Sequence, residues 1–444
     1  MKKRFYMFPI ILLMMAIFTA CDPDNNQEFP GNGTETGSYE VKSDIQFPMN
    51  LFLTGIPEEY AAFKEPLASM VAMRESALAQ ELGKAEINLG FRKITYLYPS
   101  CGVKGDSITL SAVAFWLGYF DNGVWNDLKP ENICLMEHYT ITSDAETPSN
   151  AFALEMFITG NTLTIMPDYI GYGITKEKPH PYLNHDICAI NSIDALTYGY
   201  DLFNDSSKYG MSPEWKLYLA GASQGAGNAV AVHKYLDTHP DLATKWNFAS
   251  TNCSSGPYSP VVTIDKYLAD DKVAYPVVFP LVMKTMFDSY PDIMKGFTEE
   301  MTYSQNYLAV KDEIDRMIAG KEHNTAAINQ LFIEKVRKTV DANLADGEIY
   351  LTDILSPAML NKESPICKAF YQCLEKNDLT KGWTPVHPMK LHYSSQDMVV
   401  PQENSLAILE AFGEDIVTLE HASFPADHTT TCSLWMVDLF SKGF

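Results

Sequence analysis

The chain has 444 residues, of which 46% are hydrophobic and 20% are charged. This composition is typical of a globular protein with one large core and an insertion, or with two domains. The formal net charge of -23 argues against nucleic-acid binding and against adsorption to anionic membranes, because both need a basic face.

Residues 1–21 are predicted to be an export signal. Basic residues at positions 2–4 precede an apolar stretch, 5–18, that is too short to span a bilayer comfortably. The signal ends in FTAC, which resembles the lipobox of bacterial lipoproteins, and we therefore expect Cys21 to be lipidated. The expected location is a bacterial membrane, on its periplasmic face or at the cell surface. Ordinary cleavage nearby is the alternative.

The next segment, 22–43, is rich in Asn, Gly, Thr, Ser and acidic residues and is predicted to be a flexible tether. A helical, apolar segment follows over 48–82. Strands are predicted over 91–98 and 107–117, joined by a turn with two glycines, so an antiparallel pair is expected here.

From residue 132 onward, predicted strands and helices alternate. This alternation indicates parallel βαβ units in a doubly wound α/β sheet. The strands are predicted over 132–137, 162–166, 216–220 and 247–253, and the helices over 151–159, 187–203 and 229–235.

The alternation stops after residue 257 and resumes at 389. The intervening segment, 261–385, is rich in helix formers, with apolar residues at helical spacing over 299–321 and 325–344. We interpret it as a helical cap inserted into a core formed by 44–260 and 386–444; an independent helical domain is the alternative. The last predicted elements are strands over 389–393 and 416–420 and helices over 403–412 and 430–440.

A G-x-S-x-G motif, GASQG at 221–225, lies between a predicted strand and a predicted helix. This context is typical of a nucleophile elbow, in which a strained Ser stands clear of a tight turn at the carboxyl edge of the sheet. Small residues at 221 and 225 let the strand and helix pack closely. We predict that Ser223 is a nucleophile; a glycine-rich turn that happens to contain Ser is the alternative.

A Ser nucleophile needs a base, and the base needs an orienting group. In this architecture the chain order is Ser, then Asp or Glu, then His. Asp397 follows the strand at 389–393, and His428 lies before the final helix, so we predict them as the acid and the base. A helix cap is the alternative role for Asp397, and a surface loop position for His428. His421 is the second candidate base.

The predicted reaction also needs two donors to the developing oxyanion, each worth roughly 3 kcal/mol. One donor is expected to be the backbone N–H of Gln224, directly after the nucleophile. The other is expected from the loop after 132–137, which holds His138 and Tyr139. A structural role for His138 is the alternative.

Eight cysteines are present, and Cys21 as an anchor leaves seven with no spacing that indicates a disulfide framework. Cys367 and Cys373 lie six residues apart and could pair locally. Neither a CxxC nor an HExxH motif occurs, so no metal site and no cofactor are predicted.

Five short segments resemble the fungal and bacterial secretory lipases. They are GASQG at 221–225, PDYIGYG at 167–173, HYT with TPS at 138–149, QDMVVP at 396–401 and ADHTT at 426–430. The resemblance covers about residues 90–440 and implies an α/β-hydrolase fold, with a mostly parallel sheet, helices on both faces and a helical lid inserted before the acid. It also implies that Asp168 and Tyr169 line and buttress the site. Where bacterial members often have His-Gly-Thr, this chain has His138-Tyr139-Thr140, a difference that bears on the substrate.

The sequence therefore predicts a serine hydrolase that cleaves carboxylic esters through an acyl-enzyme. Its expected partner is a small-molecule or acylated-glycan ester, held in a pocket that includes Tyr258. One alternative is a peptidase of the prolyl-oligopeptidase type, disfavoured by the short region between the tether and the first predicted strand. A non-catalytic binding lipoprotein on a hydrolase fold is the other.

Overall fold

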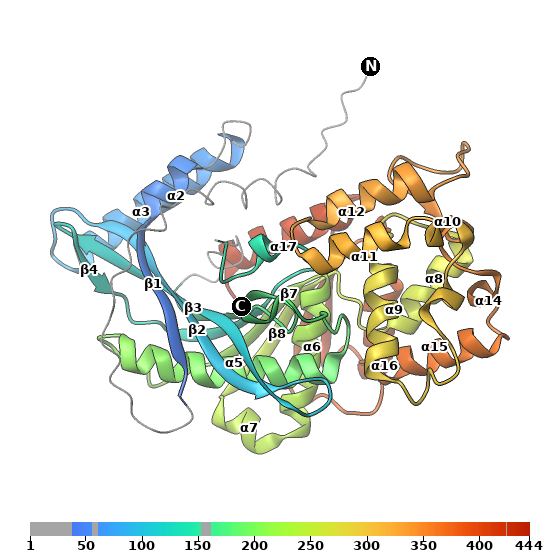
Figure 1. The fold of residues 1–444 in the computed structure, drawn as a ribbon. Coiled ribbons are helices and arrows are strands. Elements are labelled where there is room, and N and C mark those ends of the chain that lie inside the picture. Colours follow the sequence, from blue (N-terminus) through green and yellow to red (C-terminus); the bar gives the residue numbers. More distant parts are fainter. Residues whose placement is uncertain (1–37, 56–60, 152–160, 423) are drawn as a thin grey trace.

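A computed structural model describes residues 38–55, 61–151, 161–422 and 424–444 (Figure 1). The predicted signal segment with Cys21, most of the tether and almost all of the helix predicted at 151–159 lie outside the described residues. No helix in the described part of the chain is long and apolar enough to cross a membrane.

The described fold is organised around one sheet with the strand order β1-β2-β3-β6-β5-β7-β8-β11-β12, in which β4 pairs with β3. The strands from β6 to β12 along this path run parallel, and the strands before them pair antiparallel. The predicted α/β class is confirmed. The strands are β1 (Glu40–Pro48), β2 (Asn88–Cys101), β3 (Ser107–Asp121), β4 (Val124–Asp127), β5 (Asn132–Glu137), β6 (Thr162–Pro167), β7 (Leu217–Ala222), β8 (Phe248–Ser254), β11 (Met389–Tyr393) and β12 (Val417–His421).

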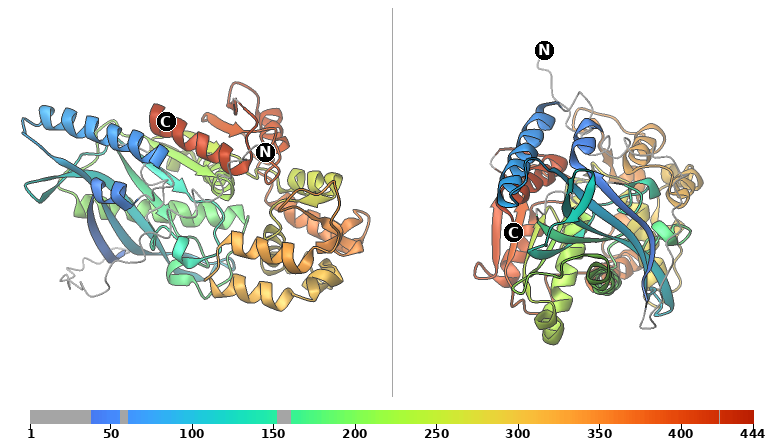
Figure 2. Two further views of the ribbon diagram at one scale, coloured as in Figure 1. Left: turned by 90° about the horizontal axis from the view of Figure 1, so that it is seen from above. Right: turned by 90° about the vertical axis from the view of Figure 1, so that its left-hand side faces the viewer.

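Helices cover both faces of the sheet (Figures 1 and 2). The central parallel strands β5 and β6 are buried on both faces, so each face needs an apolar cover. One face packs on α5 (His185–Ser206), α6 (Gln224–Thr238), α7 (Pro240–Lys245) and α16 (Glu403–Phe412). The other packs on α2 (Met49–Gly55), α3 (Ala61–Glu81) and α17 (His428–Lys442).

The chain between β8 and β11 forms a helical group with its own hydrophobic core, on the right of Figure 1. Tyr182 and Leu183, which precede α5, also belong to this second core. The elements of the group are α8 (Pro260–Asp270), β9 (Lys272–Val273), α9 (Val278–Ser289), η5 (Glu299–Thr302), α10 (Gln305–Leu308), α11 (Lys311–Gly320), α12 (Thr325–Leu331), η6 (Phe332–Val336), β10 (Ile349–Tyr350), α13 (Leu351–Ile354), α14 (Pro357–Leu360) and α15 (Pro365–Lys376).

Two helix predictions in this group are wrong in length. The segment 299–321 is divided into η5, α10 and α11, and Ser304 caps α10 by accepting a hydrogen bond from the N–H of Tyr307. The helix predicted over 325–344 ends at Val336. Beyond it, the carboxylate of Asp353 accepts hydrogen bonds from two backbone N–H groups that a longer helix would have used, those of Lys338 and Thr339.

Strand β1 begins at Glu40, inside the segment expected to be a tether, and pairs antiparallel with β2 at the edge of the sheet. The seven cysteines that the structure describes are all free thiols, so the suggested pair of Cys367 and Cys373 is wrong. Both lie on α15, where residues six apart point to different sides of the helix.

Candidate functional site

Ser223 occupies the turn between β7 and α6 with φ 55° and ψ −123°, a backbone conformation that is strained for a residue with a side chain. Its N–H donates to the carbonyl of Ser254 at 2.9 Å. A Cβ on Gly221 would collide with the backbone of Gly225, and a Cβ on Gly225 would collide with the carbonyl of Glu137. The turn therefore requires glycine at both ends of the predicted motif.

The structure brings Ser223, His428 and Asp397 together. The Nε2 atom of His428 lies 2.9 Å from Ser223 Oγ, and its Nδ1 atom lies 2.7 Å from Asp397 Oδ2. Because an ionised carboxylate only accepts hydrogen bonds, Nδ1 carries the proton, and Nε2 is left to accept from the Ser hydroxyl. The nitrogen that can accept a proton thereby faces the Ser223 hydroxyl.

Hydrogen bonds to backbone N–H groups fix the positions of both Asp397 and His428. Asp397 lies in the acid loop, residues 394–402 between β11 and α16, and its Oδ1 accepts from the N–H groups of Val399 at 2.9 Å and Val400 at 2.8 Å. His428 is the first residue of α17, which Asp427 caps by accepting from the N–H of Thr430. His421, the second candidate base, is exposed at the end of β12 instead.

Gln224 is the first residue of α6, so its N–H has no acceptor within the helix. Its side chain is buried, with Nε2 2.7 Å from Nε2 of His180. The backbone N–H of Gln224 is thus not used by α6, while its side chain is engaged by His180.

The imidazole of His138 does not supply the other donor. Its Nδ1 donates to the carbonyl of Tyr139 at 2.7 Å, and the ring stacks on Tyr169 with centroids 4.0 Å apart. Burial lowers the pKa of His138 to about 4, so the ring is neutral near pH 7 and has only the one N–H. In the same loop, Thr140 lines the pocket beside Ser223, and its hydroxyl lies 2.9 Å from Tyr182 Oη.

Asp168, Tyr169 and Tyr258, expected in the substrate pocket, are buried and do not line it. Asp168 accepts hydrogen bonds from the Ser111 hydroxyl at 2.5 Å, from the Ser149 N–H at 2.9 Å and from the Ser149 hydroxyl. Burial raises the pKa of Asp168 to about 6, although these hydrogen bonds oppose the shift. Its carboxylate ties β3 to the loop before β6.

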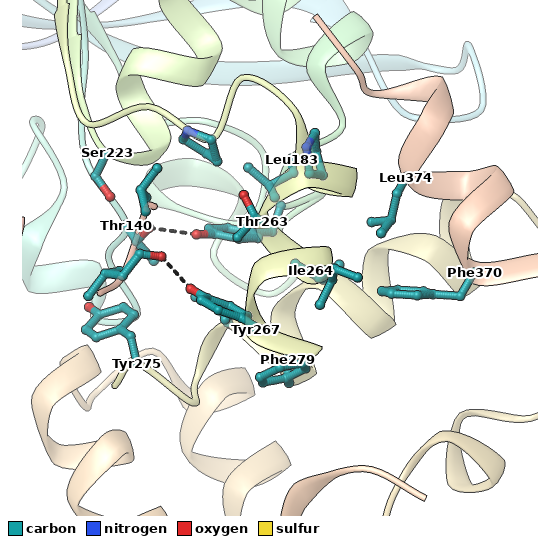
Figure 3. Close-up of a pocket in the computed structure, with 17 residues that line it drawn as sticks. Thr140, Leu183, Ser223, Thr263, Ile264, Tyr267, Tyr275, Phe279, Phe370 and Leu374 are labelled. Carbon is teal, nitrogen blue, oxygen red and sulfur yellow. Dashed lines mark hydrogen bonds between the residues drawn. The ribbon is translucent and has the colours of Figure 1, made fainter. Parts of the chain in front are cut away.

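The pocket that reaches Ser223 encloses about 630 Å³ of space, part of it open to solvent (Figure 3). None of its 17 lining residues carries a charged side chain, so the pocket suits an uncharged, apolar group. Most of the lining comes from α8, α9 and α15, from the acid loop and from the segments around Thr140 and Tyr182. The lining residues are Thr140, Tyr182, Leu183, Ser223, Pro257, Pro260, Thr263, Ile264, Tyr267, Tyr275, Val278, Phe279, Val282, Phe370, Leu374, Val399 and Val400.

Sequence reasoning missed most of the pocket residues, among them Thr140, Tyr182 and Tyr267. Thr140 belongs to the quoted HYT segment, but no motif contains Tyr182 or Tyr267, and only the packing of the helical group brings those two to Ser223. Among the described residues, no group of three or more His, Cys, Asp or Glu side chains is placed to hold a metal ion.

No protein-family model and no curated protein sequence matches the chain. The fold is similar to solved structures at low sequence identity. A ligand-bound form of the rice cell wall degrading esterase LipA from Xanthomonas oryzae has 18% identity and a TM-score of 0.63, over 90% of this chain and 97% of the other. A candidate hydrolase from Legionella pneumophila has 18% identity and a TM-score of 0.64, over 91% and 98%.

Lipase A from Candida antarctica has 12% identity and a TM-score of 0.50, over 80% of this chain and 78% of the other. At these identities the similarity establishes the fold. The mostly parallel sheet and its covering helices are those of the α/β-hydrolase fold, as the sequence predicts.

Proposed function

We propose that this protein is a serine hydrolase that cleaves carboxylic esters with an uncharged, apolar acyl group. The observation that carries the proposal is the chain of hydrogen bonds from Asp397 through His428 to Ser223, at one end of a cavity with no charged lining residue. The strained elbow supports the same proposal, because strain of this kind is concentrated at functional turns.

In the proposed reaction, Ser223 Oγ attacks the ester carbonyl while His428 Nε2 takes the hydroxyl proton. Asp397 keeps the imidazole in the tautomer that accepts this proton and stabilises the imidazolium that forms. The imidazolium then protonates the leaving alcohol, and an acyl-enzyme remains on Ser223. Water, deprotonated by His428, attacks the acyl carbon and releases the carboxylic acid.

The negative charge on the carbonyl oxygen needs fixed donors during both steps. We assign one to the backbone N–H of Gln224, which has no acceptor within α6. The other is assigned to Thr140, the residue of the loop after β5 that lines the pocket beside Ser223. Loss of one such donor lowers kcat by about 100- to 1,000-fold in comparable sites.

Two of the similar structures support ester hydrolysis as the reaction, since one is an esterase and the other a lipase. The apolar lining supports the acyl preference independently of them, because it includes Val278, Phe279 and Phe370 but no ionised group.

The test is covalent labelling of the purified protein with a fluorophosphonate, together with turnover of p-nitrophenyl esters. The wild type should be labelled and active, whereas Ser223→Ala should lose labelling and at least about 10,000-fold in kcat. Aminoacyl-prolyl anilides, used as control substrates, should be poor. An unlabelled wild type, equal labelling of Ser223→Ala, or faster cleavage of the anilides would overturn the proposal.

A further inference from the structure

We propose that His180 is a positioning residue that holds Gln224, and with it the backbone N–H assigned to the oxyanion, in its working orientation. This inference rests on the proposed function and names a residue that takes no part in bond making. His180 lies in the segment between η4 (Gly173–Thr175) and α5, far along the chain from the elbow that it contacts.

The hydrogen bonds of His180 define its tautomer. Its Nδ1 lies 2.8 Å from the carbonyl of Ile170, which can only accept, so Nδ1 carries the proton. In the neutral ring Nε2 is then an acceptor, and it lies 2.7 Å from the side-chain amide nitrogen of Gln224, which donates to it. Burial lowers the pKa of His180 to about 3, so the ring stays neutral through the working range of most enzymes.

A stack of rings joins His180 to the loop that supplies the other proposed donor. The ring of Tyr169 is nearly parallel to that of His180, at 13° with centroids 5.8 Å apart, and it also stacks on the ring of His138, with centroids 4.0 Å apart. His138 begins the loop after β5, two residues before Thr140. The stack therefore ties that loop and the first residue of α6 to one rigid support.

Gln224 has little freedom to find another partner. The residue is 1% exposed, and a buried amide without a hydrogen bond is unfavourable. If His180 could no longer accept, the amide would have to rotate toward the pocket or toward solvent. Because Gln224 is tightly packed, either movement would shift the first turn of α6 and carry the N–H of Gln224 away from the substrate's carbonyl oxygen.

Two substitutions separate the two hydrogen bonds of the ring. In His180→Gln the amide oxygen can occupy the place of Nε2 and still accept from Gln224. In His180→Asn the amide nitrogen can replace Nδ1 and still donate to Ile170, but the acceptor for Gln224 is lost. Thermal unfolding of both variants provides the check that each is folded.

We expect His180→Asn to lower kcat for a p-nitrophenyl ester by about 10- to 100-fold with little change in KM, because misplaced donors weaken binding of the transition state and not of the substrate. His180→Gln should retain kcat within about threefold of the wild type, since a conserved acceptor conserves the contact. Gln224→Met removes the same hydrogen bond from its other end, so it should match His180→Asn, and the double variant should lose no more than either single one.

Equal losses of kcat in the Asn and Gln variants, a change confined to KM, or additive losses in the double variant would overturn the role of His180. If the His180 variants do not fold, the Gln224→Met variant still tests the role of His180, and an unchanged kcat in that variant is enough to overturn it. These results differ from a failure of the proposed function, which is seen in the wild type as an absence of fluorophosphonate labelling and of ester turnover.

Discussion

Ser223 is held in a conformation that side-chain-bearing residues rarely adopt, and its neighbours explain how it can persist. Strain of this kind costs about 1–3 kcal/mol per residue. The hydrogen bond from its N–H to Ser254 and the close packing of Gly225 against Glu137 hold the turn from two sides. The elbow thus depends on residues that never meet the substrate.

Among these supporting residues, Glu137 has a buried carboxyl group whose loss of hydration is poorly offset by hydrogen bonds. Its side chain is fully buried at the end of β5, and neither carboxylate oxygen has a well-formed hydrogen bond to any residue that the structure describes. Burial raises its pKa to about 7, although the hydroxyls of Ser192 and Tyr169 pull it in the opposite direction. The folded protein therefore holds a proton on Glu137 in a pH range where the unfolded chain releases it.

This difference predicts the pH dependence of stability. Between pH 5 and about 7 the unfolded state is ionised at Glu137 and the folded state is not, so unfolding releases a proton and stability falls as pH rises; above about pH 7 both states are ionised and the fall levels off. Glu137→Gln, which copies the protonated shape, should gain roughly 3 kcal/mol relative to the wild type between these pH values. Urea unfolding at pH 5 and pH 8 measures the gain.

The exposed carboxylate of Glu86 offers the matched control, and Glu86→Gln should track the wild type at both pH values. A constant stability difference between Glu137→Gln and the wild type over this range would contradict the prediction.

At the scale of elements, α8 has two roles. Its Thr263, Ile264 and Tyr267 side chains line the apolar pocket, and the Tyr267 hydroxyl donates to the carbonyl of Val399 in the acid loop (Figure 3). Tyr267 and Asp397 also line a second, more polar cavity of about 580 Å³. Tyr267 is thus the wall that separates the two cavities, and its hydrogen bond connects the helical group to the loop that holds Asp397.

Removal of this wall should change substrate preference. Tyr267→Ala should join the two cavities and shift the preferred p-nitrophenyl ester to a longer acyl chain, by roughly tenfold in relative kcat/KM, a value typical of one or two methylenes in an apolar pocket. Tyr267→Phe keeps the ring but loses the hydrogen bond to Val399, so it should lower kcat without changing the preferred chain length.

A series of esters from acetate to palmitate measures both effects. If Tyr267→Ala retains the wild-type order of substrates, the wall does not limit the acyl group.

At the scale of the whole molecule, the candidate site lies where two cores meet. Ser223 is carried by the sheet and its covering helices, whereas most of the pocket wall comes from the helical group between β8 and β11. Tyr182 and Leu183 join that group's core from the first part of the chain. A substrate in this pocket would therefore contact both cores at once.

Export and anchoring are also properties of the whole molecule, and we propose that lipid on Cys21 holds the protein at a bacterial membrane. In a bacterial host, Cys21→Ser should abolish incorporation of labelled palmitate, because the thiol that accepts the lipid is removed. The variant should also move from the membrane to the soluble or uncleaved precursor fraction.

The free thiol Cys101, which is partly exposed, provides the control, and Cys101→Ser should keep both label and location. Palmitate incorporation that persists in Cys21→Ser would rule out lipidation at this position.

The sequence by itself determined the features that follow from local rules. The alternation of strands and helices predicts the parallel sheet, and β5, β11 and α16 have the predicted bounds. The elbow and the order of Ser223, Asp397 and His428 were also available, because a strained turn needs small flanking residues and the ends of parallel strands share one edge.

Only the tertiary structure decided which side chains face the cavity. His138 and Asp168 sit in segments that resemble a lipase site, yet hydrogen bonds to Tyr139, Ser111 and Ser149 turn them into supports. Tyr267 faces the cavity through the packing of a helical group whose position no motif predicts. The physical reason is that periodicity and turn chemistry act between near neighbours, whereas the direction of a side chain is decided by partners that the folded chain brings from far away.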